Sequence, residues 1–293
     1  MQNSTGDARH TEQIAAHGLK ALRLRASGSE ALVYLQGAHV ASFRTSEHGE
    51  LLWLSAQALY APGKAIRGGV PLCFPWFGAH ASRTDLPAHG FARTHEFQFE
   101  GSETRGDSVL AELSLTSSAE TRSLFPHAFK ARLRLCVGRE LSLAFEVENT
   151  GADPFDYELA LHTYLGVSDV RSVEVAGLSG ARYDDKVNGA RAVLQGDEPL
   201  RLVTETDRVY DSKARVSVLD VGRTRRLVID KTCSGTSVVW NPWVDKAKRM
   251  SDFGDDEWPH MLCVEAANTG PHRITLLPES RHTTTTIISA ETP

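Results

Sequence analysis

The sequence predicts an all-β fold, either a sandwich or a barrel, and two observations lead to this class. Apolar and polar residues alternate with a period of two wherever a pattern can be read. Gly, Pro, Asn and Asp separate these short runs, and no window shows a long, well-capped amphipathic helix. Many short strands with turns between them are typical of β-sandwiches and β-barrels.

The clearest element is a hairpin over residues 133–147. Leu133, Leu135 and Val137 alternate with arginine and cysteine, and after the turn at 138–140 the alternation resumes from Leu141 to Val147. One face of this hairpin should therefore be buried. The other expected strands span residues 31–36, 38–43, 51–54, 95–100, 108–116, 157–165, 226–230, 236–240, 261–266 and 283–288.

The 293 residues carry no internal repeat, Gly/Ser linker or charge block that would mark a domain boundary. All-β chains of roughly 200–250 residues often form one domain, so the length does not require two. We expect a frayed N-terminal segment over residues 1–20 and a single sandwich domain with few short helices over residues 21–290.

Charge and cysteine content narrow the class of protein further. The formal charge of −5 argues against nucleic acid as a partner. The first 20 residues contain no apolar core of a signal peptide, and no run approaches 18 apolar residues, so we expect no membrane partner. The four cysteines lie far apart without a CxxC pair, which predicts reduced core cysteines of a cytoplasmic protein and no zinc site.

Two loop-like segments break the alternation. Glycines, prolines and aromatic residues fill residues 66–78, a composition suited to the wall of a pocket with Arg67 at its mouth. An irregular crossing of the scaffold with a solvated arginine explains the same composition. In the segment 89–93, Gly90 follows His89, and a glycine lets backbone approach a ligand closely.

Two strand-like segments carry residues that a scaffold rarely contains. In 157–165, Leu159 and Leu161 share one face while His162 lies on the other, although a histidine on a strand is more often structural than catalytic. Glu265 stands in the apolar run 261–268. Burying an unpaired charge costs several kcal/mol, so Glu265 must be paired, protonated or facing a polar cavity.

Two more segments fit the rim of a site. Residues 205–210 are charged, include Asp207, and read as a loop between strands. Residues 240–243 place Trp240 and Trp243 near each other, as in an aromatic platform that stacks on a sugar face. A solvated loop and a core edge filled by two tryptophans are the structural alternatives.

A histidine and a carboxylate without an activated serine or cysteine indicate proton transfer. The sequence contains no GxSxG, Walker, GxGxxG or HExxH motif. Interconversion of sugar anomers needs only an acid and a base: the base removes the proton of the C1 hydroxyl while the acid protonates the ring oxygen. Each such group typically contributes about 10²–10⁴-fold, and no metal, nucleotide or flavin is required.

Six motifs together resemble the glucose-6-phosphate 1-epimerase family of the aldose 1-epimerase superfamily, and they follow the family's order over roughly residues 20–290. They are IRGGVP to WFG (66–78), HGFAR (89–93), LHTY (161–164), ETDRVY (205–210), VWNPW (239–243) and CVEAAN (263–268). The resemblance implies the galactose-mutarotase-like β-supersandwich, a monomer without a cofactor, and a hexose 6-phosphate as substrate.

Residue by residue, the resemblance assigns the following roles. His162 matches the acid that protonates the ring oxygen, and Glu265 matches the general base. Arg67 and Arg93 match positions that hold the substrate and its phosphate; Asp207 matches a carboxylate that binds sugar hydroxyls, and His89 lies in a motif that contacts the sugar.

Two departures from the family pattern concern affinity more than chemistry. Ala88 stands where many relatives carry glutamine before HGFAR, and Glu279 stands where a glycine is expected. Two alternatives remain: an aldose 1-epimerase acting on unphosphorylated sugars, and a non-catalytic carbohydrate-binding sandwich protein. The two arginines favour a phosphorylated sugar over a neutral one, because charge-assisted hydrogen bonds contribute roughly 1.5–3 kcal/mol each.

Overall fold

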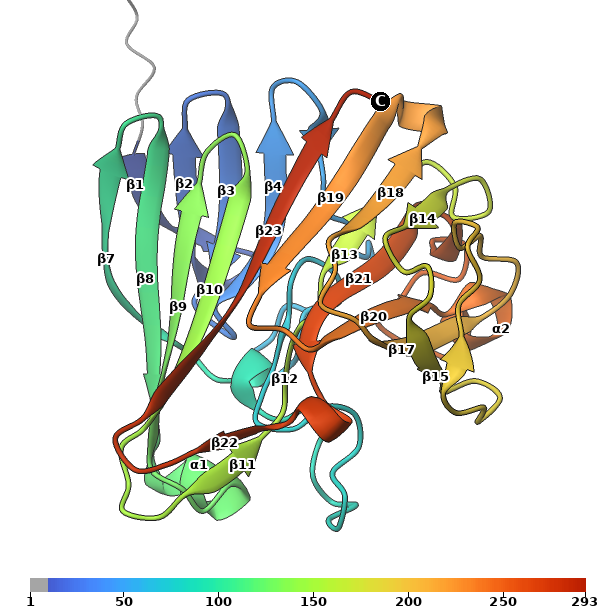
Figure 1. The fold of residues 1–293 in the computed structure, drawn as a ribbon. Coiled ribbons are helices and arrows are strands. Elements are labelled where there is room, and N and C mark those ends of the chain that lie inside the picture. Colours follow the sequence, from blue (N-terminus) through green and yellow to red (C-terminus); the bar gives the residue numbers. More distant parts are fainter. Residues whose placement is uncertain (1–9) are drawn as a thin grey trace, which may run out of the picture.

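The computed structural model describes residues 10–293 and consists mainly of β-sheet, which confirms the predicted fold class (Figure 1). The central sheet has eight strands. In spatial order they are β14 (Glu174–Ala176), β18 (Val216–Asp220), β19 (Arg225–Thr232), β23 (Arg281–Glu291), β10 (Leu141–Asn149), β9 (Phe129–Val137), β8 (Ser108–Thr116) and β7 (Gln98–Arg105).

Two further sheets cover one face of the central sheet. The N-terminal sheet contains β1 (His10–Ala16), β2 (Leu19–Ala26), β3 (Ser29–Tyr34), β4 (His39–Thr45) and β5 (Gly49–Glu50). The site sheet contains β16 (Val193–Leu194), β15 (Arg182–Asp185), β17 (Thr206–Asp211), β20 (Thr236–Asn241), β21 (Met261–Asn268), β12 (Leu159–Leu161) and β6 (Leu72–Cys73), with β13 (Tyr164–Gly166) also paired to β21. Strands β2 and β3 pack against β8 and β9, while β21 packs against β19 and β23.

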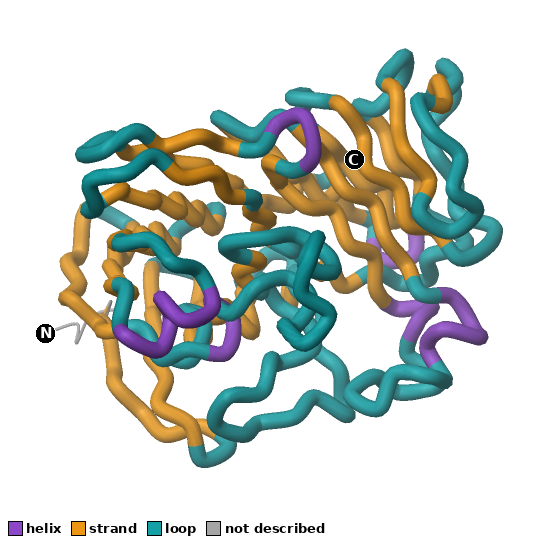
Figure 2. Tube along the Cα trace, turned by 90° about the horizontal axis from the view of Figure 1, so that it is seen from below, coloured by secondary structure: helices purple, strands orange, loops and turns teal. Residues whose placement is uncertain are grey.

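Helical structure is confined to short turns between strands. It comprises α1 (Ala119–Leu124), α2 (Trp243–Ala247) and the 3₁₀ turns η1 (Ala92–Thr94), η2 (Val221–Arg223), η3 (Trp258–His260) and η4 (Gly270–His272); a two-stranded ladder joins β11 (Phe155–Tyr157) to β22 (Ile274–Leu276). Seen from below, loops and helical turns gather over one end of the strands (Figure 2).

One cluster of buried apolar side chains runs through all three sheets. It extends from Leu22 on β2, through Leu133 on β9 and Val264 on β21, to Ile288 on β23. The predicted hairpin is confirmed as β9 and β10, and its alternating apolar residues are buried. The single-domain boundary at residues 21–290 stays a prediction.

The chain differs from the expectations at three places. Residues 10–20, expected to be frayed, pair along β1 and β2, and Ile14 packs on a small cluster that contains Tyr34; the remainder of that segment, residues 1–9, lies outside the described residues. Residues 205–210, expected to be a loop, supply the inner strand β17. The expected strand 51–54 forms only isolated bridges at Leu52 and Leu54.

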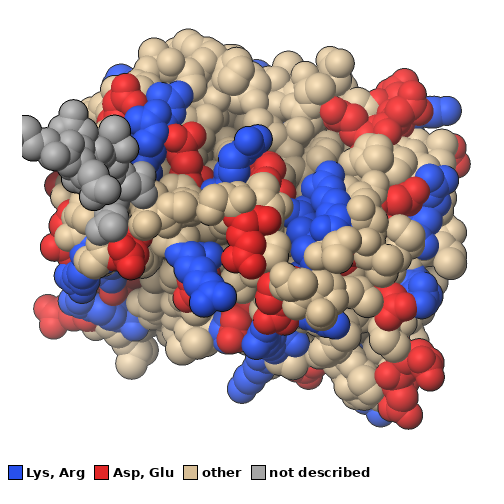
Figure 3. All heavy atoms as spheres, turned by 90° about the horizontal axis from the view of Figure 1, so that it is seen from above, with Lys and Arg blue, Asp and Glu red and all other residues tan. Residues whose placement is uncertain are grey.

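All four cysteines are free, as predicted. Cys73 and Cys263 are buried and Cys136 is half-buried, whereas Cys233 is exposed and so is not the core residue we expected. Within the described part of the chain, no helix has the length and apolar character needed to cross a bilayer. Acidic and basic side chains are interspersed over the face shown in Figure 3.

Candidate active site

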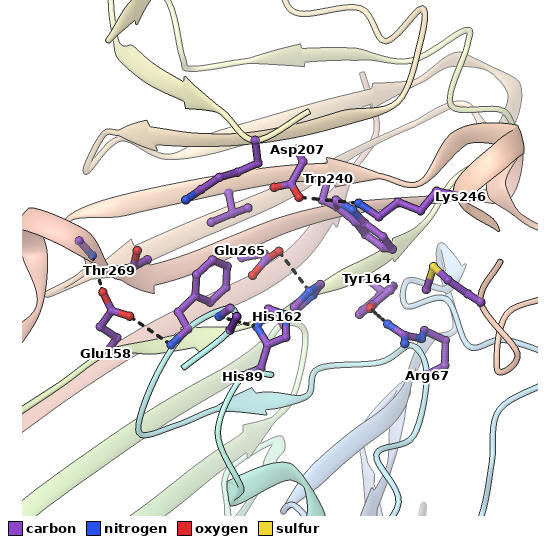
Figure 4. A pocket seen from close by; sticks show the side chains of 17 residues that line it. Arg67, His89, Glu158, His162, Tyr164, Asp207, Trp240, Lys246, Glu265 and Thr269 are labelled. Atoms are coloured by element: carbon purple, nitrogen blue, oxygen red, sulfur yellow. Dashed lines mark hydrogen bonds and ion pairs between the residues drawn. The ribbon is translucent and has the colours of Figure 1, made fainter. Parts of the chain in front are cut away.

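The register of the site sheet sets His162 opposite Glu265. Strands β12 and β13 pair with β21 in one common register, so the two residues between them lie across from Val264 and Glu265. Directly opposite residues of antiparallel strands point their side chains to the same face. His162 Nε2 consequently lies 3.4 Å from Glu265 Oε1 (Figure 4).

The strand expected over residues 157–165 is interrupted at this point. His162 N–H donates to the carbonyl of Pro71 at 3.0 Å, while Thr163 N–H bends back to the carbonyl of Leu161. Thr163 carbonyl still accepts from Val264 N–H, which keeps the register. The segment 66–78 thus contacts the backbone of His162 itself, in addition to lining the cavity beside it.

The pair lies at the floor of a cavity of about 630 Å³. Volumes of this order are typical of small-molecule sites. Strand alternation explains the floor: Leu262, Val264 and Ala266 join the core, whereas Glu265 faces the cavity. The other lining residues are Arg67, Phe77, Gly78, Ala79, His89, Glu158, His162, Tyr164, Lys186, Asp207, Val238, Trp240, Lys246, Met250, Thr269 and Gly270.

Burial favours the neutral form of both members of the pair. Desolvation raises the pKa of Glu265 well above its usual value, and the charge of Asp207 adds to this effect. Desolvation also lowers the pKa of His162 well below its usual value, with His89 and the nearby arginines adding to it. In this neutral form Glu265 carries the proton that can move to His162. The move gives a carboxylate beside an imidazolium and leaves the total number of protons unchanged.

Two of the three explanations considered for a carboxylate in an apolar strand hold for Glu265, protonation and a polar cavity, and its neighbour His162 is not a charged partner. It is 1% exposed, lies beside His162, and lines the cavity. Two buried atoms of the pair, His162 Nδ1 and Glu265 Oε2, have no hydrogen-bond partner among the described residues. These atoms are free to bond to a ligand.

Arg67 lines the cavity, as predicted, but its guanidinium is already engaged. Its Nε and Nη2 donate to both carboxylate oxygens of Asp252 at 3.1–3.2 Å, and its Nη1 donates to the Tyr164 hydroxyl at 3.0 Å. The Tyr164 ring stacks on His162, with ring centroids 4.7 Å apart and nearly parallel. Arg67 thereby fixes the aromatic neighbour of the histidine.

Arg93 is not among the lining residues of the cavity, although it lies close enough for its charge to lower the pKa of both His89 and His162. Its Nη2 donates to the carbonyl of Ala88 at 2.8 Å. Gly90 is required by chain packing, because a Cβ there would lie 2.0 Å from the carbonyl oxygen of Phe74. The sequence motif contains both Arg93 and Gly90, but it does not determine the path of the loop and hence which of its side chains face the cavity.

His89 does reach the cavity and stands edge-on to His162, with ring centroids 5.8 Å apart. The ring Nδ1 of His89 accepts from the backbone N–H of Gly78 at 3.3 Å, and the backbone N–H of His89 donates to the Gly78 carbonyl. Burial lowers the pKa of His89 to about 3, with the charges of Arg93 and Arg67 adding to the effect. His89 is thus a neutral wall residue.

Asp207 and Trp240 occupy the next row of the sheet, since β17 pairs them directly. Lys246 Nζ lies 4.0 Å from Asp207 Oδ2 and 5.8 Å from the centre of the Trp240 ring (Figure 4). Trp240 is therefore the half of the expected aromatic platform that lines the cavity, whereas Trp243 packs on Trp258.

Sequence reasoning missed several lining residues, among them Glu158, Lys186 and Lys246. Glu158 accepts hydrogen bonds from the N–H groups of Phe77 and Gly270 and so ties two walls together. Lys246 lies a few residues after the motif that contains Trp240, and this proximity in the sequence could have identified it as a lining residue. Lys186 had none, because only the pairing of β15 with β17 brings it to the cavity.

Stability should depend on pH through the buried pair. The raised pKa of Glu265 stabilises the fold at low pH, and this contribution is lost as the pH rises from the unfolded value of 4.5 towards the folded pKa. The lowered pKa of His162 has the opposite sign, and its contribution is lost as the pH falls below 6.5. Of these two contributions to stability, only that of Glu265 still changes above about pH 6.5.

We therefore expect the melting temperature of Glu265→Gln, relative to that of the wild type, to increase as the pH rises above about 6.5. Circular dichroism melts of both proteins over a series of buffers measure this difference. A difference that does not change with pH would show that Glu265 is already ionised in the folded protein.

The geometry can be set beside known proteins. The family model of aldose 1-epimerase matches residues 20–289. A protein of Cenchrus ciliaris named "putative glucose-6-phosphate 1-epimerase" is 37% identical over an alignment of 261 residues, which covers 85% of this chain and 78% of that one. A protein of the same name from Escherichia coli K12 is 38% identical over 234 residues, 80% of this chain and 78% of that one.

The similarity to this family extends to a solved structure. The crystal structure of a "putative mutarotase" from Salmonella typhimurium superimposes with a TM-score of 0.89 at 30% identity, covering 97% of this chain and 93% of that chain. The similarity therefore extends over nearly the whole chain. It confirms the predicted mutarotase-like fold, and the chain belongs to the aldose 1-epimerase family.

Proposed function

We propose that this chain interconverts the α and β anomers of a hexose 6-phosphate, with Glu265 as the base and His162 as the acid. The observation that carries the proposal is the facing pair: a histidine and a carboxyl group 3.4 Å apart, buried, and on the floor of a cavity of sugar size. The names of the relatives from Cenchrus ciliaris and Escherichia coli support the phosphorylated substrate.

The reaction needs one proton to leave the sugar and one to reach it. Moving the Glu265 proton to His162 converts the neutral pair to a carboxylate and an imidazolium without changing the number of protons. Glu265 then takes the proton of the C1 hydroxyl while His162 protonates the ring oxygen. The bond between C1 and the ring oxygen breaks, an aldehyde forms, the C1–C2 bond rotates, and the reverse steps close the ring on the other face.

The surrounding side chains suit a sugar. Trp240 offers an apolar ring for a sugar face, and Asp207 offers an acceptor for hydroxyl groups. Burial raises the pKa of Asp207, although Lys246 and Lys186 oppose this. Tyr164 stacks on the His162 ring and His89 contacts it edge-on, so two aromatic neighbours restrict its rotation.

The anionic group of the substrate has three cations at the cavity: Arg67, Lys186 and Lys246. Arg67 is paired with Asp252, and Lys246 with Glu205 at 2.9 Å. Because Arg93 lies outside the lining, the two-arginine argument for a phosphate does not hold in its original form. A plain aldose 1-epimerase acting on neutral sugars is accordingly the second candidate.

Replacing Asp252 by Asn tests whether Arg67 receives the phosphate. The amide cannot neutralise the guanidinium, so we expect the KM for glucose 6-phosphate to fall by about tenfold, within the range of one charge-assisted hydrogen bond. The KM for glucose should not change. The control is Asp255→Asn, an exposed aspartate of the same loop. Equal KM values in Asp252→Asn and the wild type would exclude a phosphate contact at Arg67.

The reaction itself is tested by polarimetry on freshly dissolved α-anomers of glucose 6-phosphate, glucose and galactose. We expect the protein to accelerate the change in optical rotation for the phosphorylated sugar most strongly. Faster change for the free sugars would assign the chain to the second candidate. No acceleration with any sugar would leave a carbohydrate-binding protein without catalysis, which the facing pair argues against.

We further propose a monomeric cytoplasmic enzyme that needs no cofactor. The four free cysteines support a reducing compartment. The formal charge of −5, with both signs interspersed on the face in Figure 3, supports a small-molecule substrate over nucleic acid.

A further inference from the structure

Cys263 adds a third ligand-type atom to the facing pair. It precedes Glu265 by two residues on β21, so strand alternation puts both side chains on the same face. One ligand atom each of His162, Cys263 and Glu265 lies within 4.8 Å of the other two, and all three residues are buried. The sequence shows no metal motif because the register of the sheet, not chain spacing, assembles this group.

We propose that His162, Cys263 and Glu265 bind Zn²⁺ or a similar soft divalent ion, and that the bound ion blocks the active site. Imidazole nitrogen, thiolate sulfur and carboxylate oxygen are the donors that zinc takes in proteins. Zinc–ligand bonds of about 2.0–2.3 Å require the three atoms to close to roughly 3.5 Å of one another. All three atoms lie within 4.8 Å of one another, so side-chain rotation would have to shorten the longest separation by about 1.3 Å.

The charges of such a complex balance. The Cys263 thiol and the Glu265 carboxyl each release a proton to solvent, and the two anions then neutralise the two charges of the ion. The His162 imidazole binds as the neutral form. A buried site disfavours a lone anion, but a complex of zero net charge avoids most of that cost.

The unused atoms of the pair give independent support. His162 Nδ1 and Glu265 Oε2 are buried without a hydrogen-bond partner, so each side chain has a ligand atom that no other described residue engages. Since Glu265 and His162 also line the cavity, the fourth position of a tetrahedral ion would open towards the sugar site. Metal and substrate would therefore compete for the same two side chains.

Titration of the protein with Cd²⁺ tests the site directly, because a thiolate bound to Cd²⁺ gives an ultraviolet charge-transfer band. The wild type, Cys263→Ser and Cys233→Ser are compared; Cys233 is the exposed thiol and the obvious adventitious ligand. We expect the band in the wild type and in Cys233→Ser, and its loss in Cys263→Ser. Cys263→Ala is a second variant in case the serine variant does not fold, and melting curves verify folding.

Inhibition provides the second readout. Zn²⁺ should slow anomer exchange by the wild type and by Cys233→Ser, with recovery on addition of EDTA, while Mg²⁺ should have no effect. The apparent affinity for Zn²⁺ should fall at least about tenfold in Cys263→Ser, since even the outer partners of metal ligands contribute about 10–100-fold. A band that persists in Cys263→Ser, or that disappears in Cys233→Ser, would overturn the proposal. The band does not depend on catalysis, so it tests the metal site even if the epimerase assignment fails.

Discussion

Glu265→Gln is expected to lower the rate of anomer exchange by about 10²–10⁴-fold, the usual contribution of one proton-transfer group. Glutamine has nearly the same shape but cannot accept the C1 proton. Because burial already keeps the carboxyl neutral, the substitution should leave the fold intact and sugar binding close to normal. Rates from polarimetry and sugar affinity from calorimetry separate loss of chemistry from loss of binding.

The matched control is Glu205→Gln. Glu205 lies near the rim on the segment that leads into β17, pairs with Lys246, and does not line the cavity. A partly exposed ion pair contributes about 0–1 kcal/mol, so the fold should be kept; release of Lys246 would act on the KM for a sugar phosphate, and the exchange rate at saturating substrate should change little. If Glu265→Gln retained full exchange, the base would have to be another carboxylate, and Asp207 would be the next residue to test.

Arg225→Met should destabilise the protein by about 3–5 kcal/mol, as removal of one partner of a buried ion pair does. Arg225 and Asp220 are 1% and 0% exposed, and Arg225 Nε lies 3.5 Å from Asp220 Oδ2. The guanidinium also donates to the carbonyl oxygens of His48, Glu50 and Gly166. Methionine would leave the three carbonyl oxygens without this donor and Asp220 without its cationic partner, with only the hydrogen bonds from Ser168, among the described residues, remaining to the carboxylate.

This buried arginine also matters for the site. Gly166 ends β13, the strand that follows His162, so Arg225 ties the central sheet to the strand beside the catalytic pair. Arg226→Met is the matched control, because Arg226 follows on the same strand with a third of its side chain exposed. Urea unfolding of both variants gives the two free energies. Equal, small losses would show that the Arg225 cluster does not stabilise the fold.

Local pattern was enough to identify the all-β fold class and to single out Glu265, but it did not identify His162 as catalytic. The apolar faces of β9 and β10 repeat every second residue, and both strands bury them. Glu265 was found because a carboxylate in an apolar strand needs a compensating environment. His162 could not be assigned from alternation alone, and its role came from the resemblance.

The sequence-based predictions that differ from the structure concern residues whose positions depend on contacts between distant segments of the chain. Strand β17 looked like a loop because one of its faces lines a polar cavity, and the alternation of its side chains is therefore not apolar against polar. The engagement of Arg67 by Asp252 involves two residues 185 positions apart in the chain. Arg93 and Gly90 lie in a recognised motif, yet only the path of the loop decides which of its residues face the cavity.

Magnetisation transfer at equilibrium is the most direct measurement of the central proposal, that the facing pair performs anomer exchange. The α-anomeric proton of glucose 6-phosphate is saturated, and the loss of the β-anomeric signal is followed for the wild type, Glu265→Gln and the double variant with His162→Asn. We expect catalytic amounts of the wild type to transfer saturation rapidly and both variants to approach the uncatalysed rate, with the second substitution adding little to the first. Undiminished transfer in the double variant would contradict the assignment of acid and base to His162 and Glu265.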